Sequence, residues 1–287
     1  MILKKEIERL AEQHGVAKST IDKDWVLGHF LDAIFSIEYC RENLIFKGGT
    51  CLRKCYFADY RFSEDLDFTA VNPDFILDRK LLMQIAVLVT ERTSIPLHFV
   101  EIKPLRHNNT QMGFQAFVKF WGADHPKNDL PPNPLRWQTS IKIEITLFEK
   151  MLFPSVTKNL SHPYSDALTS AADTVPCYSL NEVMSEKLRS LIQRSYTAPR
   201  DFYDIWYLKN HLENIDWQVI VNAFHEKMAF KNLSFTGIEQ MINEENNKHL
   251  QTAWRNSLAH QINPELLPEY EAVKDELLKL FEEIFKV

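Results

Sequence analysis

The chain has 287 residues, of which 45% are apolar and 25% charged, and its formal net charge is −6. This composition excludes a disordered chain, and the negative charge argues against a protein that coats nucleic acid regardless of sequence. No apolar run reaches the ~20 residues that span a bilayer, and the first residues lack the apolar stretch of a signal peptide. We therefore expect a cytoplasmic protein without a membrane segment.

The first half of the chain alternates helical and strand-like patterns. The expected elements, in chain order, are helices at 3–13 and 20–40, a strand at 44–46, a helix at 50–57, a strand at 62–70, a helix at 74–93, and strands at 97–103, 113–121 and 139–148. The last strand alternates most clearly, because Ile141, Ile143 and Ile145 are separated by Lys142 and Glu144.

The second half is helical after a polar, irregular stretch at 153–176. The expected helices are 180–195, 199–212, 216–228, 236–257 and 266–285. We therefore predict an α+β fold, in which a mixed β-sheet core with flanking helices is followed by an all-helical C-terminal domain. The predicted parts are N-terminal helices at 1–42, the core at 43–155 and the helical domain at 175–287.

The four cysteines are Cys40, Cys51, Cys55 and Cys177, and their spacing does not match a zinc motif. Cys51 and Cys55 are four residues apart and so share one helix face. We expect them to be buried small hydrophobic residues rather than metal ligands or a disulfide.

A glycine pair is the first candidate for a ligand site. Only seven glycines occur in the chain, and Gly48 and Gly49 stand side by side, followed by Thr50. They join a predicted strand to a predicted helix, where unhindered N–H groups and the helix dipole can bind a phosphate, and Lys47 adds a cation. The motif is not a Walker A loop. The alternative is a tight turn that binds nothing.

Two aspartates form the second candidate. Asp65 and Asp67 alternate along a predicted strand, so both project from one face, roughly 7 Å apart. Two such carboxylates repel unless a cation lies between them, and Mg²⁺ prefers carboxylate oxygens together with substrate phosphates. Ser63 stands beside them, and Glu144 is the best candidate for a further acid on an adjacent strand. The alternatives are an exposed polar face and a solvated strand glutamate.

The helical half carries charged residues around aromatic ones. Asp201 and Asp204 share a helix face, and Lys187 and Arg200 could neutralise the charge of a triphosphate. The alternative is an amphipathic helix whose charges pair among themselves. A phosphate-binding turn followed closely by metal-binding carboxylates is the arrangement of a nucleotidyltransferase site.

Together these motifs resemble the AbiEii/AbiGii toxin family of bacterial nucleotidyltransferases, found in type IV toxin–antitoxin and abortive-infection systems. The similarity extends over residues 20 to 210. The motifs that carry it are Lys47-Gly48-Gly49-Thr50-x-Leu52, Arg61-x-Ser63-Glu64-Asp65-Leu66-Asp67-Phe68, Glu144, Glu186-Lys187-Leu188-x-x-Leu191, Arg200-Asp201-x-Tyr203-Asp204 and Lys23-Asp24-Trp25. Such enzymes more usually have Asp where this chain has Glu144.

The resemblance implies a nucleotidyltransferase core with a helical partner domain, magnesium-dependent use of an NTP, and an antitoxin encoded nearby. Some relatives block the acceptor end of tRNA. Our leading hypothesis is transfer of a nucleoside monophosphate from an NTP to RNA, at the 3′ end of tRNA, which stops growth. Two alternatives remain: transfer to a protein, or a nucleotide-binding or antitoxin-binding module without turnover.

Each candidate residue has a role in this hypothesis. Gly48, Gly49, Thr50 and Ser63, with Lys47, hold the phosphates. Asp65 and Asp67 hold Mg²⁺, and Glu144 completes a second metal site or helps to deprotonate the acceptor. Lys187, Arg200, Asp201 and Asp204 form the far wall of the nucleotide site.

Overall fold

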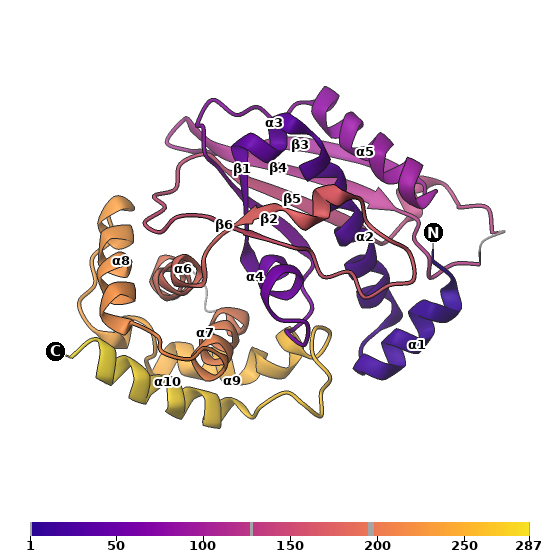
Figure 1. Ribbon diagram of the computed structural model, residues 1–287. Helices are drawn as coiled ribbons and strands as arrows, with labels where there is room; N and C mark the ends of the chain where they lie inside the picture. Colours follow the sequence, from indigo (N-terminus) through magenta and orange to yellow (C-terminus); the bar gives the residue numbers. More distant parts are fainter. Residues whose placement is uncertain (1, 127–128, 195–197, 287) are drawn as a thin grey trace. The chain divides into compact units, whose positions relative to one another are not determined.

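The computed structural model describes residues 2–126, 129–194 and 198–286. The chain divides into two compact units, the first comprising Met1–Glu149 and Ser155–Tyr178 and the second Lys150–Pro154 and Ser179–Val287. The first unit contains a β-sheet and the second a set of helices (Figure 1). Three positions at the ends of predicted segments lie outside the described residues. They are the end residues 1 and 287, and residue 195, the last of the helix predicted at 180–195.

Among the described residues, seven strands form one mixed sheet in the order β3-β4-β5-β2-β1-β7-β6 (Figure 1). Their bounds are β1 (Leu44–Lys47), β2 (Asp65–Ala70), β3 (Leu97–His107), β4 (Thr110–Phe120), β5 (Ser140–Thr146), β6 (Val156–Lys158) and β7 (Val175–Cys177). Strand β2 pairs antiparallel with β1 and parallel with β5. The parallel pairing requires a long connection, which here contains α5 and the β3–β4 hairpin.

Alternation along the central strands separates an apolar face from a polar one. Ile143 and Ile145 of β5 are buried with Leu66 and Phe68 of β2 in the main hydrophobic core. The intervening residues, including Asp65, are only half-buried and project from the opposite side of their strands. This alternation supplies the register that positions the candidate site.

The helices of the first unit pack around a central buried one. They are α1 (Lys4–His14), α2 (Lys18–Ser36), α3 (Glu38–Asn43), α4 (Gly48–Cys51) and α5 (Arg79–Thr93); α4 continues as a π-helix over Leu52–Tyr56, and 3₁₀ turns cover Pro134–Arg136 and Ser170–Asp173. Helix α2 contacts α1, α5 and the sheet. It is apolar around most of its circumference, and Trp25, Phe30 and Phe35 are fully buried, as expected for a helix inside a core.

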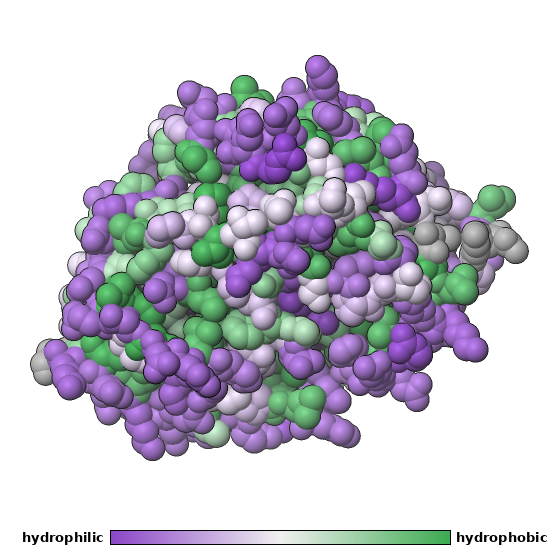
Figure 2. Space-filling view, viewed as in Figure 1, coloured by the Kyte–Doolittle hydropathy of each residue, from purple (hydrophilic) through white to green (hydrophobic). Residues whose placement is uncertain are grey.

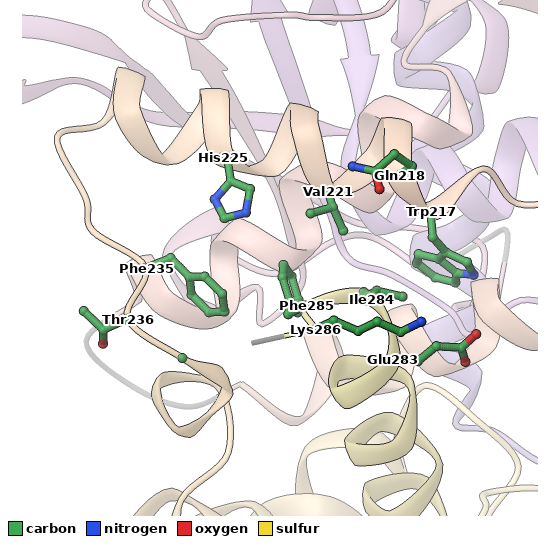
Figure 3. A pocket seen from close by; sticks show the side chains of 11 residues that line it. Trp217, Gln218, Val221, His225, Phe235, Thr236, Glu283, Ile284, Phe285 and Lys286 are labelled. Atoms are coloured by element: carbon green, nitrogen blue, oxygen red, sulfur yellow. The ribbon is translucent and has the colours of Figure 1, made fainter.

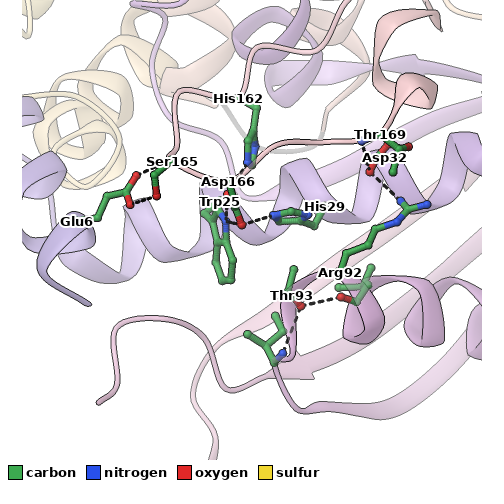
Figure 4. Close-up of polar contacts among 12 residues, drawn as sticks. Glu6, Trp25, His29, Asp32, Arg92, Thr93, His162, Ser165, Asp166 and Thr169 are labelled. Atoms are coloured by element: carbon green, nitrogen blue, oxygen red, sulfur yellow. Dashed lines mark hydrogen bonds and ion pairs between the residues drawn. The ribbon is translucent and has the colours of Figure 1, made fainter. Parts of the chain in front are cut away.

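The segment that precedes β7 is attached to α2 by carboxylate hydrogen bonds (Figure 4). Asp166 accepts from Trp25 Nε1 at 3.1 Å, from His29 Nε2 at 3.1 Å and from His162 Nε2 at 3.0 Å. Burial opposes ionisation, but the hydrogen bonds from the two histidines hold the pKa of Asp166 well below its usual range. These bonds fix the long segment that the sequence leaves irregular.

The second unit consists of helices. They are α6 (Leu180–Gln193), α7 (Pro199–His211), α8 (Trp217–Phe230), α9 (Glu244–Leu258) and α10 (Tyr270–Ile284), with a 3₁₀ turn at Ile238–Gln240. A fully buried ion pair joins α6 to α8, because Lys227 Nζ lies 2.5 Å from Glu182 Oε1. The other Glu182 oxygen accepts the backbone N–H groups of Leu152 and Phe153, each at 2.9 Å.

The α+β prediction is confirmed, with differences at particular elements. The predicted helix 20–40 breaks at Ile37, whose backbone is extended. The helix predicted at 236–257 begins at Glu244, because Asn243 and Asn246 form a capping box there. The segment predicted to be irregular, 153–176, contains β6 and the start of β7, which are three residues each and too short to show alternation.

No helix in the described part of the chain is long and apolar enough to cross a membrane. On the face drawn in Figure 2, hydrophobic residues are interspersed among hydrophilic ones.

Candidate functional site

A row of polar residues crosses the centre of the sheet. Lys47 of β1 is the register partner of Asp67 in β2, Asp67 is the partner of Glu144 in β5, and Glu144 is the partner of Gln115 in β4. Residues directly opposite one another on neighbouring strands project from the same face. Four strands therefore bring one cation, two carboxylates and an amide into line.

The second aspartate lies on the same face, one register step away. Asp65 and Asp67 alternate with the buried Leu66 and Phe68 and are themselves half-buried. Burial, together with the Asp65 and Glu144 carboxylates, raises the pKa of Asp67 to about 6, although Lys142 and Lys47 oppose the shift. The face therefore has an excess of negative charge that would favour a bound cation.

Lys142 lies among these carboxylates. Its Nζ is 2.9 Å from Asp65 Oδ2 and 3.5 Å from Glu144 Oε2. Burial alone would lower the pKa of Lys142, but Asp65, Glu144 and Asp67 together raise it. The sequence placed Lys142 on the polar face of its strand and gave it no role at the site. Because Lys142 and Glu144 are two residues apart on one strand, their shared face was the signal that could have placed Lys142 at the site.

The glycine turn lies directly against the acidic face. Gly48 has φ +82°, a conformation that L side chains rarely adopt, and a Cβ at Gly48 would lie 2.4 Å from Asp67 Oδ2. Any other residue at this position would displace the Asp67 carboxylate. Because Gly48 is the first residue of α4, the start of this short helix lies next to the Asp67 carboxylate.

Gly49 and Thr50 connect the turn to the segment that leads into β2. A Cβ at Gly49 would lie 2.8 Å from Arg61 Nη2 and 2.9 Å from Ser63 Oγ. The buried Thr50 hydroxyl donates to the backbone oxygen of Asp65 at 2.6 Å. Thr50 therefore ties the turn to the strand through its side chain, and its backbone N–H is the group left for a phosphate.

The donor set of the acidic face fits a hard divalent cation. Asp65, Asp67 and Glu144 offer only carboxylate oxygens, the ligands that Mg²⁺ prefers. In the described part of the chain their oxygens do not all come within 4.8 Å of one another, and the Lys142 ammonium contacts two of the three. A cation shared by all three would therefore require Lys142 to move.

In the second unit, the predicted residues form an ion-pair network. Lys187 Nζ lies 2.8 Å from Asp201 Oδ1 and 2.6 Å from Asp204 Oδ2. Arg194 Nη1 contacts the other Asp201 oxygen at 3.1 Å. Both aspartates are buried, whereas Arg200 is half-buried. The structure thus brings Lys187, Asp201 and Asp204 together. In the described part of the chain, Arg200 forms no ion pair with this network.

A family model described as the nucleotidyl transferase AbiEii toxin of type IV toxin–antitoxin systems matches residues 29–276. The match spans most of the chain. This protein belongs to the AbiEii family.

Solved structures agree with the family in fold. The AbiEii chain is similar to MenT4, a nucleotidyltransferase toxin of Mycobacterium tuberculosis, with a TM-score of 0.66 and 18% identity over 100% of this chain and 91% of that one. It also resembles a putative nucleotidyltransferase from H. pylori, with a TM-score of 0.55 and 13% identity over 94% and 96% of the two chains. A search of curated protein sequences finds no significant match. The predicted family and the nucleotidyltransferase-like fold are confirmed.

The AbiEii chain also contains clusters away from the acidic face. Within the described residues, two groups bring three metal-ligating atoms to within 4.8 Å: Cys51, Cys55 and Cys177, and His29, His162 and Asp166. The second unit has a cavity of about 620 Å³ between α8, the 235–237 segment and the end of α10 (Figure 3). Its lining includes Trp217, Phe235 and Phe285, and it has one carboxylate, Glu283. This lining provides no carboxylate pair for metal-assisted transfer.

Proposed function

We propose that this AbiEii chain transfers a nucleoside monophosphate from an NTP to RNA in a magnesium-dependent reaction. The acceptor is the 3′ end of tRNA, and a cognate antitoxin encoded nearby restrains the resulting block of growth. The observation that carries the proposal is the contact between the glycine turn and the acidic face, where a Cβ at Gly48 would meet Asp67 at 2.4 Å. A phosphate on the turn and a cation on the aspartates would be neighbours.

Each side chain of the first unit contributes binding or orientation. The N–H groups of Gly48, Gly49 and Thr50 bind the β- and γ-phosphates, assisted by the Ser63 hydroxyl and the Lys47 ammonium. Asp65 and Asp67 hold Mg²⁺, with Glu144 as the third carboxylate. Bound Mg²⁺ supplies Lewis acidity at the phosphoryl oxygens and neutralises charge on the leaving group.

The proposed reaction is an in-line displacement at the α-phosphorus. The acceptor hydroxyl oxygen forms a new bond to that phosphorus, and the bond from the α-phosphorus to the oxygen bridging to the β-phosphate breaks. Pyrophosphate leaves with the bonding electron pair. Glu144, which is the register partner of Asp67 on the acidic face and is half-buried, takes the hydroxyl proton.

Separate roles are proposed for residues of the second unit, considered by itself. Lys187 and Arg200 act as phosphate-binding cations, and Asp201 and Asp204 hold Lys187 in place. Because Lys187 is already paired with both aspartates, a phosphate would share its ammonium with them. Lys187→Ala should therefore raise the KM for the NTP more than it lowers the kcat.

The decisive experiment follows label from the NTP into tRNA. Incubation with each α-labelled NTP, Mg²⁺ and bulk tRNA should label tRNA, whereas γ-labelled NTP should not. Asp65→Ala with Asp67→Ala should reduce labelling by at least about 10³-fold. The double variant should unfold at a similar temperature, because removing two carboxylates that repel each other offsets the loss of the Asp65–Lys142 ion pair. Asp74→Asn, an exposed acid of the same unit, is the matched control and should retain activity.

The other outcomes distinguish the alternatives. Label in lysate protein rather than tRNA would indicate a protein acceptor, and label from the γ position alone would exclude nucleotidyl transfer. NTP binding measured by calorimetry without any product would indicate a binding module. Retained labelling by the double variant would overturn the roles given to Asp65 and Asp67.

A further inference from the structure

Three of the four cysteines of this chain meet behind the glycine turn. Cys51 ends α4, Cys55 lies in the π-helix that continues α4, and Cys177 ends β7. Their sulfur atoms all lie within 4.8 Å of one another. Strand β7 pairs in parallel with β1, with Cys177 opposite Phe46, so two segments far apart in sequence deliver these sulfurs to one point.

We propose that Cys51, Cys55 and Cys177 bind a thiophilic d¹⁰ metal ion, Zn²⁺ or Cu⁺, through three thiolates. Thiolate ligands select such ions over Mg²⁺ and other hard cations. With metal–sulfur bonds of about 2.3 Å, three sulfurs around one ion lie about 4 Å apart. The sulfur atoms of the cluster, all within 4.8 Å of one another, already lie near that spacing.

The surroundings of the cluster favour the thiolate form at Cys177 alone, because burial raises the pKa of Cys51 and the hydrogen bond with Cys177 raises the pKa of Cys55. Hydrogen bonds from the Cys51 and Cys55 thiols lower the pKa of Cys177, burial opposes the shift, and Lys158 supports it. Lys158 Nζ lies 4.9 Å from the centre of the Tyr56 ring, and the Tyr56 hydroxyl is 3.8 Å from Cys177 Sγ. Metal binding displaces the three thiol protons to solvent, so that one ion replaces three protons.

Solvent can reach the cluster beside one of the three cysteines. Cys51 and Cys177 are fully buried, whereas Cys55 is only half-buried. An ion can therefore enter beside Cys55, and a solvent molecule on that side can complete the four-coordinate geometry that Zn²⁺ prefers. Cu⁺ needs no fourth ligand. A bound ion would clamp the helix that begins at Gly48 to β7.

The histidine cluster is the weaker candidate for the same ion. His29 and His162 direct their Nε2 atoms at Asp166, which already accepts hydrogen bonds from both. A metal bound through the two Nε2 atoms would replace these hydrogen bonds and would leave each buried Nδ1 without the partner that metal-binding histidines normally have on the second nitrogen. The charged hydrogen bonds to Asp166 account for that cluster, whereas the three thiols make only weak hydrogen bonds to one another and to Tyr56.

The experiment uses the full chain, reduced and stripped of metal, in the absence of NTP and RNA. Co²⁺ serves as the optical probe, because thiolate coordination gives an intense charge-transfer absorption; Zn²⁺ and Cu⁺ are then titrated against chromophoric chelators. We expect one ion per chain, and the relative affinities identify the preferred ion. Cys177→Ala should weaken binding at least 100-fold, whereas Cys40→Ala, at a buried cysteine outside the cluster, should leave it unchanged.

Thiol alkylation keeps the test valid if Cys177→Ala fails to fold. In the wild-type chain, bound metal should protect Cys55 from N-ethylmaleimide, as counted by mass spectrometry of peptides, and a chelator should restore its reaction. Absence of Co²⁺–thiolate absorption would overturn the proposal. So would binding that survives Cys177→Ala and is lost in His162→Ala. None of these readouts depends on nucleotidyl transfer.

Discussion

At the scale of single residues, Gly48 meets two requirements at once. Its positive φ admits few L residues, and its Cα faces the Asp67 carboxylate without a side chain between them. Gly48→Ala should destabilise the chain by about 1–2 kcal/mol through backbone strain. It should also lower the kcat by about 10²-fold, because a carboxylate displaced by even 1 Å loses its catalytic geometry.

The control for Gly48 is another glycine with a positive φ. Gly15 ends α1 with φ 62° and has no part in the proposed site. Gly15→Ala should introduce backbone strain of the same kind, without the collision with Asp67, and should keep full activity. Equal activity in the two variants would show that the space beside Asp67 is not what Gly48 provides.

Asp22 gives the chain a pH dependence of stability. It is buried in α2 and accepts the Ala123 N–H at 2.7 Å; burial raises the pKa of Asp22 to about 7. Since this pKa exceeds the unfolded value of about 3.9, the folded state binds the extra proton. The free energy of unfolding should therefore fall as the pH rises from about 4 to about 7, by at most about 4 kcal/mol in total.

The measurement compares wild type with Asp22→Asn by urea denaturation from pH 4.5 to 8. The amide cannot ionise, so the wild type should lose stability relative to the variant as the pH rises. A difference between the two that is constant across this range would contradict the assignment.

At the scale of elements, a buried ion network joins α2 to the helix that follows the glycine turn. Asp24 Oδ2 lies 2.6 Å from Lys54 Nζ, and Asp24 Oδ1 lies 3.1 Å from Arg53 Nε. Burial alone would raise the pKa of Asp24, but Lys54 and Arg53 outweigh it and lower the pKa to about 2. Tyr164 adds a hydrogen bond of 2.7 Å. These ion pairs therefore fix the segment that follows the glycine turn against α2.

Asp24→Asn should destabilise the chain by about 3–5 kcal/mol, because Lys54 would remain buried without a full counter-charge. Chemical denaturation measures the change. Lys23→Met is the neighbouring control: it removes a more exposed pair with Glu64 at 3.0 Å and should cost less than about 1 kcal/mol. Similar losses in the two variants would show that burial of the network contributes little.

Sequence patterns predict elements well where burial is periodic. The alternation of Ile141, Ile143 and Ile145 predicts β5, and the Asp65–Asp67 spacing predicts a shared face because β2 has the burial pattern that alternation requires. Strands β6 and β7 could not be predicted, since three residues carry no period. The start of α9 was missed because the capping box of Asn243 and Asn246 lies inside an otherwise helical pattern.

Contacts between segments that are distant in sequence limit how much of the site can be predicted. The sequence indicates a further acid near Asp67, but only the parallel register places Glu144 directly opposite it. The ammonium of Lys142 among the carboxylates and the contact of Arg61 with Gly49 depend on rotamers and on pairing that no local pattern encodes. Likewise, the spacing of Cys51 and Cys55 gives no indication that Cys177 joins them.

At the scale of the whole molecule, the salt dependence of tRNA binding reports how many Lys and Arg side chains contact phosphates. Each phosphate neutralised by Lys or Arg adds to the salt dependence of binding, and this chain carries a net charge of −6. The logarithm of tRNA affinity should fall with the logarithm of KCl concentration with a slope of magnitude below about 5. Filter binding measures this slope between about 50 and about 200 mM KCl, the range over which salt changes the affinity strongly. A steeper slope would reveal a concentrated basic surface.

The position of β2 between β1 and β5 has a consequence for synthesis. The ribosome completes the glycine turn and both aspartates early, but the parallel neighbour arrives only after α5, β3 and β4 have been translated. At about 5–20 residues per second, that delay lasts roughly 4 to 15 s. A nascent chain that has not yet completed β5 therefore has an unfinished sheet and a dispersed acidic face, and the proposed activity has to await the translation and pairing of that strand.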